Sequence, residues 1–224
     1  MSKREEFIDK TDRRKIPKLS YSIEYICDRI VDWYYHVETT KIAKLSIHDN
    51  KINYMYEPFP YRKLIHLFKC YPFEENDGFI DIGCGKGRVL VEASLHGCCN
   101  IYGVDLSEEL LVYARKNMRE CQKKNHSIKY QLLCMNAKDY VFSPDINKVF
   151  LYNPFNLKIL IRVLKALMYS IETNPRKVTL FLGGPEGILR YMKHLKQFSL
   201  IAIENNVHIY QYTLENMWSW LLSS

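Results

Sequence analysis

The chain has 224 residues, of which 47% are hydrophobic and 25% are charged, and its formal net charge is +7 at pH 7. These proportions indicate a globular protein with a sizeable core and exclude an intrinsically disordered chain. No apolar run approaches the roughly 18 residues of a membrane span, and the charged first six residues lack the apolar stretch of a signal peptide. We therefore expect a cytoplasmic protein without a membrane partner.

The N-terminal part of the chain differs in composition from the rest, because all nine glycines lie at or after position 78. Its apolar residues recur at helical spacing; they are Ile23, Ile26, Cys27, Ile30, Tyr34 and Val37. We interpret residues 1–60 as a helical N-terminal cap with an aromatic lid segment. We expect the apolar stripe of this cap to pack into a core.

Residues 48–61 break the helical pattern. Two prolines near the end of this segment bias the residues before them toward extended geometry. Tyr54, Tyr56 and Tyr61 therefore lie on or beside a stiff, non-helical stretch. The composition is equally compatible with a lid over a site and with a linker packed on the surface.

From residue 78 onward, short apolar runs alternate with helical patterns. The expected strands cover residues 79–82, 100–104, 128–135, 148–152, 178–182, 198–203 and 207–212. The expected helices cover residues 62–71, 87–96, 108–122, 157–172 and 187–196. This alternation predicts an α/β fold, with a doubly wound, mostly parallel seven-stranded sheet. Because only three residues separate the last two strands, we expect one antiparallel strand.

The chain is organised around residues 79–90, where an apolar run ends in an acid and three glycines follow at every second position. Glycines let the backbone approach a ligand closely, and the N–H groups at the start of the next helix suit a polar group. Arg88 stands where a dinucleotide-binding loop has a small residue, and no hydroxyl residue follows Lys86 as in a phosphate-binding loop. NAD and ATP are therefore disfavoured.

The run Asp81-Ile82-Gly83-Cys84-Gly85-Lys86-Gly87 completes the pattern D-x-G-x-G-x-G. This pattern resembles the first motif of the class I S-adenosylmethionine-dependent methyltransferases, and the resemblance extends over roughly residues 54–213. It implies that residues 61–224 form a methyltransferase domain with S-adenosyl-L-methionine as cofactor. The cofactor-binding residues that it implies are Tyr56, Tyr61, Asp81, Gly83, Cys84, Gly85, Gly87, Asp105, Leu106, Asn136, Ala137 and Asn153.

Two polar residues at strand ends have alternative interpretations. Asp105 ends the second strand, where a carboxylate can accept both hydroxyls of a ribose, but an acid there can also simply begin the next helix. Asn136 follows the third strand, where the family usually has an acid that holds the adenine amino group. The amide oxygen of Asn136 can accept from that amine, and Asp139 is the alternative.

The run Asn153-Pro154-Phe155 follows the fourth strand and resembles the [DNS]-P-P-[YF] motif of amino-group methyltransferases, with one proline missing. The resemblance implies that the Asn153 side chain and the Pro154 carbonyl accept hydrogen bonds from the target amine, while Phe155 packs against the substrate. These three residues are the expected catalytic set. The alternative is a plain turn in which Asn153 caps the following helix.

The sequence thus predicts a methyltransferase for an amine nitrogen of a protein or small molecule. Related protein lysine methyltransferases typically have a hydroxyl residue in place of Phe59, which weakens any transfer of substrate from them. Two alternatives stay open: a nucleic-acid adenine methyltransferase, favoured by the positive charge, and a non-catalytic protein-binding module that associates through Trp218 and Trp220.

The seven cysteines contain no C-x-x-C pair, so we expect neither a metal site nor structural disulfides.

Overall fold

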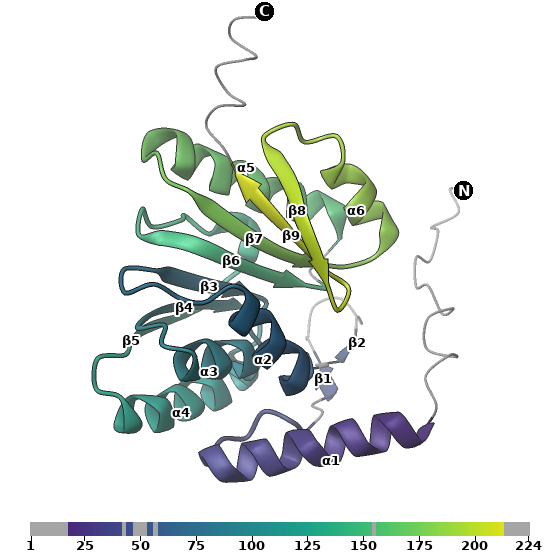
Figure 1. Ribbon diagram of the computed structural model, residues 1–224, viewed down its shortest axis with the longest axis vertical. Coiled ribbons are helices and arrows are strands. Elements are labelled where there is room, and N and C mark those ends of the chain that lie inside the picture. The colour runs from purple at the N-terminus through teal and green to yellow at the C-terminus, as the bar shows by residue number, and fades with distance from the viewer. Residues whose placement is uncertain (1–17, 42–43, 47–52, 56–57, 154–155, 213–224) are drawn as a thin grey trace, which may run out of the picture.

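The computed structural model describes residues 18–41, 44–46, 53–55, 58–153 and 156–212. Its centre is a seven-stranded sheet with the strand order β5-β4-β3-β6-β7-β9-β8 (Figure 1). The strands are β3 (Gly78–Ile82), β4 (Asn100–Asp105), β5 (Lys129–Cys134), β6 (Ile146–Tyr152), β7 (Val178–Gly183), β8 (Phe198–Glu204) and β9 (Val207–Tyr212). Only β9 runs opposite in direction to the other six strands. The predicted fold class is confirmed.

The helices in the described part of the chain connect or flank these strands. They are α1 (Lys18–Tyr35), α2 (Tyr61–Cys70), α3 (Arg88–Leu95), α4 (Glu108–Lys124), α5 (Leu157–Thr173) and α6 (Glu186–Met192), with one 3-10 turn at Ala137–Asp139. Side-chain caps define two of the starts, because Ser107 accepts from the N–H of Leu110 and Asn156 accepts from that of Ile159. A small antiparallel pair, β1 (Lys44–Ser46) and β2 (Asn53–Met55), follows α1.

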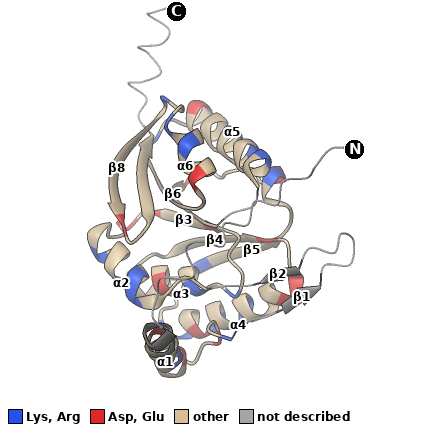
Figure 2. Ribbon diagram, turned by 90° about the vertical axis from the view of Figure 1, so that its right-hand side faces the viewer, with Lys and Arg blue, Asp and Glu red and all other residues tan. Residues whose placement is uncertain are grey.

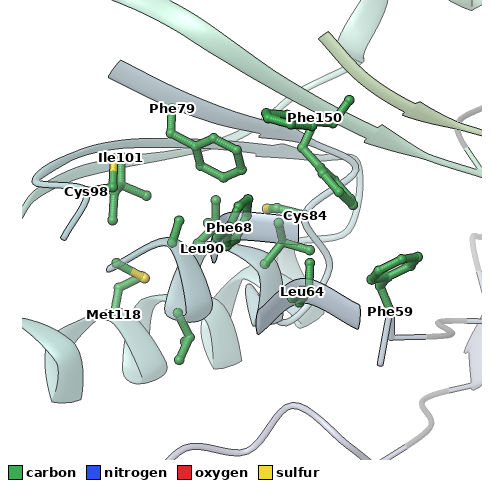
Figure 3. Close-up of a cluster of buried hydrophobic side chains, with 14 of the residues drawn as sticks. Phe59, Leu64, Phe68, Phe79, Cys84, Leu90, Cys98, Ile101, Met118 and Phe150 are labelled. Carbon is green, nitrogen blue, oxygen red and sulfur yellow. The ribbon is translucent and has the colours of Figure 1, made fainter. Parts of the chain in front are cut away.

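The core is divided by the sheet into two layers, since successive side chains of a strand point to opposite faces. Phe79 and Phe150 point to one face, where they meet Leu64 and Phe68 of α2 and Leu90 of α3 (Figure 3). On the other face, the neighbouring strand positions pack against α5 and α6; they include Ile80, Val149 and Leu180. The central strands β3 and β7 are buried along almost their whole length, which explains why short, continuous apolar runs are enough to predict them.

Of the predicted apolar stripe, Val37, which follows α1, is buried in the core. The part of the stripe on α1 itself does not pack into a core, so there the prediction is wrong. Its apolar residues face outward and are more than half exposed: Ile23 at 55%, Ile26 at 56%, Ile30 at 58%, Trp33 at 76% and Tyr34 at 66%. The acidic residues Asp28 and Asp32 of the same helix are buried instead. The helix therefore presents its polar side to the protein, which reverses the usual amphipathic arrangement.

Arg88 is the buried cation that explains this orientation. Its guanidinium forms an ion pair with Asp28 and donates to the hydroxyls of Thr39 at 2.8 Å and Thr40 at 2.7 Å, and to the carbonyl of Phe59 at 3.3 Å. Only 1% of Arg88 is exposed. A buried charge is tolerated only when it is paired and hydrogen-bonded, so these contacts fix α1 against the start of α3.

Asp32 completes the same network one helical turn further along α1. Its carboxylate accepts hydrogen bonds from the backbone N–H groups of Thr39 and Thr40, at 2.9 and 2.7 Å, and from the hydroxyl of Tyr61 at 3.1 Å. The guanidinium of Arg88 lies over the ring of Tyr61, 4.5 Å from its centroid. The two acids of α1 are thus held at the junction of α1, α2 and α3.

No helix within the described residues is both long and apolar enough to cross a membrane.

Candidate active site

The carboxyl ends of β3 and β4 lie side by side and carry the glycine loop between them. The loop is docked on the end of β4, because the N–H groups of Gly83 and Cys84 donate to the carbonyl of Val104, at 2.7 and 3.0 Å. The N–H of Gly85 donates to the Asp105 carboxylate at 2.8 Å. The loop and Asp105 therefore form a single rigid edge.

The loop glycines adopt backbone angles that other residues avoid. The φ angles of Gly83, Gly85 and Gly87 are 93°, 53° and 78°, all in the left-handed region. Gly87 also begins α3, and a Cβ there would lie 3.2 Å from the Cβ of Ala114. The spacing of one glycine at every second position thus reflects the conformation of the turn.

Asp105 is held in place from two sides. Its Oδ1 accepts from the N–H of Ser107 at 2.8 Å, while Oδ2 accepts from Gly85. Each oxygen keeps a further lone pair for an outside donor. Burial raises the pKa of Asp105, and these backbone N–H groups oppose that shift. The neighbouring Leu106 is 54% exposed and offers an apolar surface beside the carboxylate.

Asp81 is the second carboxylate at this edge and is buried at the end of β3. Burial, followed by the nearby negative charge of Asp105, raises its pKa well above the ordinary value. Among the described residues, no side-chain hydrogen bond or ion pair to the Asp81 carboxylate is formed. A buried acid without a partner is costly, and a cationic ligand would relieve that cost.

Asp81 faces a cavity of about 40 Å³ between the glycine loop and the end of β6. Phe59, Phe150 and Tyr152 form its aromatic wall, and Phe59 packs edge-on against Tyr152 with ring centroids 4.5 Å apart. Figure 3 shows Phe59 and Phe150 on the same side of the sheet as Cys84. The segment just before α2 therefore closes one side of the site. Burial raises the pKa of the Cys84 thiol well above its ordinary value, which does not suit a nucleophile.

The residues after β5 lie in the 3-10 turn. The Asn136 side chain caps this turn by accepting from the N–H of Lys138 at 3.2 Å. Its oxygen has a second lone pair available. Ala137 is buried, whereas Asp139 is exposed. Both Asn136 and Asp139 therefore stay candidates for an adenine contact.

Asn153 ends β6 with a φ angle of 43°. Left-handed geometry is uncommon for a residue with a side chain, although Asn tolerates it better than most, and strain of this kind clusters at functional sites. Its N–H donates to the carbonyl of Gly183 at 2.9 Å, and its side chain is exposed. Pro154, Phe155 and Tyr56, which were also predicted to belong to the site, lie outside the described residues.

Tyr61 lies in the buried network rather than at the exposed edge. Its hydroxyl bonds to Asp32 and lies 3.1 Å from the hydroxyl of Thr39, and the residue is 1% exposed. A polar contact between Tyr61 and a cofactor would require these bonds to break. In the sequence, Arg88 serves only as an argument against a dinucleotide-binding loop. Its buried contacts with α1 were not predicted. An arginine in the otherwise apolar start of α3 is the signal that points to a buried partner.

A family model for a methyltransferase domain matches residues 79–168. These residues include the glycine loop, Asp105 and Asn153. The chain is 10% identical to the solved structure titled "Human methyltransferase 10 domain containing protein", with a TM-score of 0.53 over 86% of this chain and 97% of that one. The fold is that of the Rossmann-like methyltransferases.

Two curated methyltransferases share sequence with parts of the chain. A "probable cobalt-precorrin-6B C(15)-methyltransferase (decarboxylating)" of Methanococcus vannielii is 31% identical over 130 residues, which are 57% of this chain and 66% of that protein. A "tRNA (guanine-N(7)-)-methyltransferase" of Clostridium kluyveri is 37% identical over 54 residues, or 23% of this chain and 26% of that protein. The chain thus spans less than two thirds of the length of each.

A methyltransferase domain implies S-adenosyl-L-methionine as the cofactor, and the residues present fit this molecule. The unpartnered carboxylate of Asp81 suits the positive charges of its ammonium and sulfonium groups. Asp105 offers fixed acceptors for ribose hydroxyls, and the exposed Leu106 offers an apolar surface for a base. The three left-handed glycines have no side chains, so their backbone can approach a ligand closely at the same edge.

Proposed function

We propose that the protein is an S-adenosylmethionine-dependent methyltransferase that acts on an amine nitrogen of a protein or small molecule. The observation that carries the proposal is the pair of acids at the adjoining ends of β3 and β4. Asp81 is buried without a partner beside a cavity, and Asp105 is held by the glycine loop. A cationic nucleoside satisfies both acids at once.

The proposed mechanism rests on placement. S-adenosylmethionine, when bound, supplies a methyl group already activated by its sulfonium. Asp105 would hold the ribose, and Asp81 would neutralise positive charge at the amino-acid end. The aromatic wall of Phe59 and Tyr152 would keep water away from the reacting centre. Orientation of this kind can contribute about 7–11 kcal/mol to lowering the barrier.

The acceptor side of the proposed site is the end of β6. The exposed amide oxygen of Asn153 would accept a hydrogen bond from the target amine and so direct its lone pair toward the methyl group. The Pro154 carbonyl and the Phe155 ring would complete this side. A neutral amine needs no general base beyond solvent, which agrees with a site built from acceptors and aromatic rings.

Titration calorimetry with S-adenosylmethionine tests the cofactor half of the proposal. We expect wild type to bind and Asp105→Ala to lose at least ~2 kcal/mol of binding free energy, the strength of a charge-assisted hydrogen bond or more. Glu75→Ala removes an exposed acid and serves as the matched control, with binding unchanged. Failure of wild type to bind at millimolar cofactor would favour the non-catalytic binding module.

A nucleic-acid substrate is the second candidate, because one relative is named as a tRNA methyltransferase and the chain is basic. Lys158, Arg162 and Lys165 are exposed along α5, where Figure 2 shows basic residues. Incubation of a cell extract with methyl-labelled cofactor separates the candidates. We expect label in protein or in small amines. Label in RNA or DNA alone would replace the amine proposal with the nucleic-acid one.

A further inference from the structure

The outer face of α1, formed by Ile23, Ile26, Ile30, Trp33 and Tyr34, is an apolar surface that the fold leaves exposed. The helix lies beyond the layer of α2, α3 and α4, at the end of the molecule away from α5 (Figure 1). Its apolar residues follow the spacing of three and four residues that is typical of a helix–helix seam. Such a contiguous apolar surface on a protein marks an interaction site.

The orientation of α1 is fixed by the protein itself. The side of the helix opposite to the outer face carries Asp28 and Asp32, which are tied to Arg88, Thr39 and Tyr61 by buried hydrogen bonds and an ion pair. Turning the apolar residues inward would break this network and leave Arg88 as an unpaired buried cation. Within the described part of the chain, the apolar residues therefore stay on the outside of the fold.

The area of the outer face reaches the lower limit for a specific dimer. An aromatic side chain buries about 150–250 Å², so Trp33 and Tyr34, at their exposed fractions, offer about 300 Å² per copy. The three isoleucines add roughly 200 Å² more, if a fully buried isoleucine hides a little over 100 Å². If the partner covered these side chains completely, two copies would bury about 1,000 Å² in total, the size at which specific interfaces begin.

We propose that the outer face of α1 is the contact between two copies of this chain, which pair their α1 helices antiparallel about a twofold axis. An axis beside residue 28 places Ile26 against Ile30 of the partner subunit and Ile23 against Trp33 of the partner subunit. Large side chains then meet smaller ones, as close packing requires, and the contact is self-complementary, as twofold symmetry requires. Antiparallel helices also set opposite dipole ends side by side.

The molar mass of the full chain in solution tests this proposal, measured by sedimentation equilibrium at micromolar concentration. We expect a dimer, and we expect Ile30→Glu to raise its dissociation constant at least tenfold, because the acid would be buried in the seam. Val141→Glu is the matched control, since Val141 is 84% exposed and far along the chain from α1. An unchanged circular-dichroism spectrum and urea midpoint show that Ile30→Glu is folded, and they keep the test separate from the proposed function.

Cys27 supplies a second test, because it is exposed, lies next to Ile26 and falls beside the proposed axis. Mild oxidation should join two copies through their Cys27 thiols, and Cys27→Ser should abolish this product. Cys70→Ser, which removes another exposed thiol, should leave this product unchanged.

A monomeric wild type would overturn the proposal, as would a dimer that Ile30→Glu leaves intact. A monomer that instead binds vesicles of phosphatidylglycerol through α1 would also overturn it.

Discussion

Asp81 links proton binding, stability and cofactor binding at one residue. Its pKa is raised in the folded protein, so the folded state binds its proton more tightly than the unfolded state does. Stability therefore falls as the pH rises from the unfolded pKa through the folded one. The charged form is favoured again when a cation occupies the site. Asp81 therefore destabilises the folded protein most when its carboxyl loses its proton and no cationic ligand is bound.

Asp81→Asn is therefore expected to stabilise the free protein while weakening cofactor binding. Because burial holds the pKa of Asp81 well above its ordinary value, we expect the free energy of unfolding of Asp81→Asn to exceed that of wild type at pH 7. Urea unfolding at pH 7 and pH 4 measures this. The gain should shrink at pH 4, where the wild-type carboxyl is largely protonated. An equal gain at both pH values would exclude the titration of Asp81 as its cause.

Asn153 is expected to serve turnover rather than cofactor binding. Asn153→Gly keeps the left-handed backbone at φ 43° without strain and removes only the side chain. We expect kcat with the acceptor to fall at least tenfold, because the amine loses its orientation, while the cofactor dissociation constant stays within twofold. Steady-state kinetics and calorimetry measure the two quantities. The opposite pattern would make Asn153 a structural turn residue.

At the level of elements, α1 depends on Arg88 for its attachment. The guanidinium reaches Asp28, Thr39, Thr40 and the carbonyl of Phe59 at once, and a lysine cannot reproduce this planar set of donors. Part of the wall of the candidate site belongs to the same assembly through Phe59. Loosening α1 should therefore also disturb the segment that leads into α2.

Arg88→Lys is expected to lower the free energy of unfolding by about 3 kcal/mol, within the range for breaking a buried ion pair. We also expect faster hydrogen exchange throughout α1, measured by mass spectrometry. Arg115→Lys changes an arginine whose pair with Glu108 lies at the surface, and it should cost less than about 1 kcal/mol. Equal effects of the two substitutions would show that the buried network does not hold α1.

For the whole molecule, the sequence predicted the centre of the sheet well because strands such as β3 and β7 are buried on both faces. Runs such as the one in β3 are continuously apolar up to Asp81 and leave little choice of structure. The orientation of α1 was not predictable in the same way. Helical periodicity identifies an apolar face but does not say whether that face meets the protein or the solvent, and here the answer depends on Arg88, 60 residues after Asp28.

The candidate site was predictable where chemistry and backbone geometry coincide. The glycines had to lie in a turn, and Asp105 had to lie at a strand end next to it, because parallel strands finish at one edge of a sheet. The lack of a partner for Asp81 needed coordinates, since it depends on what surrounds the carboxylate. The place of Tyr61 in the buried network also depends on contacts between distant parts of the chain.

The reliance of α1 on Arg88 has a consequence during synthesis on the ribosome. The acids at positions 28 and 32 emerge some 60 residues before the guanidinium that neutralises one of them, which is several seconds at ordinary rates of translation. During that interval the buried side of the nascent helix, with Asp28 and Asp32, has no place to dock. The helix should therefore dock only once the turn that follows β3 has formed and has brought Arg88 into place.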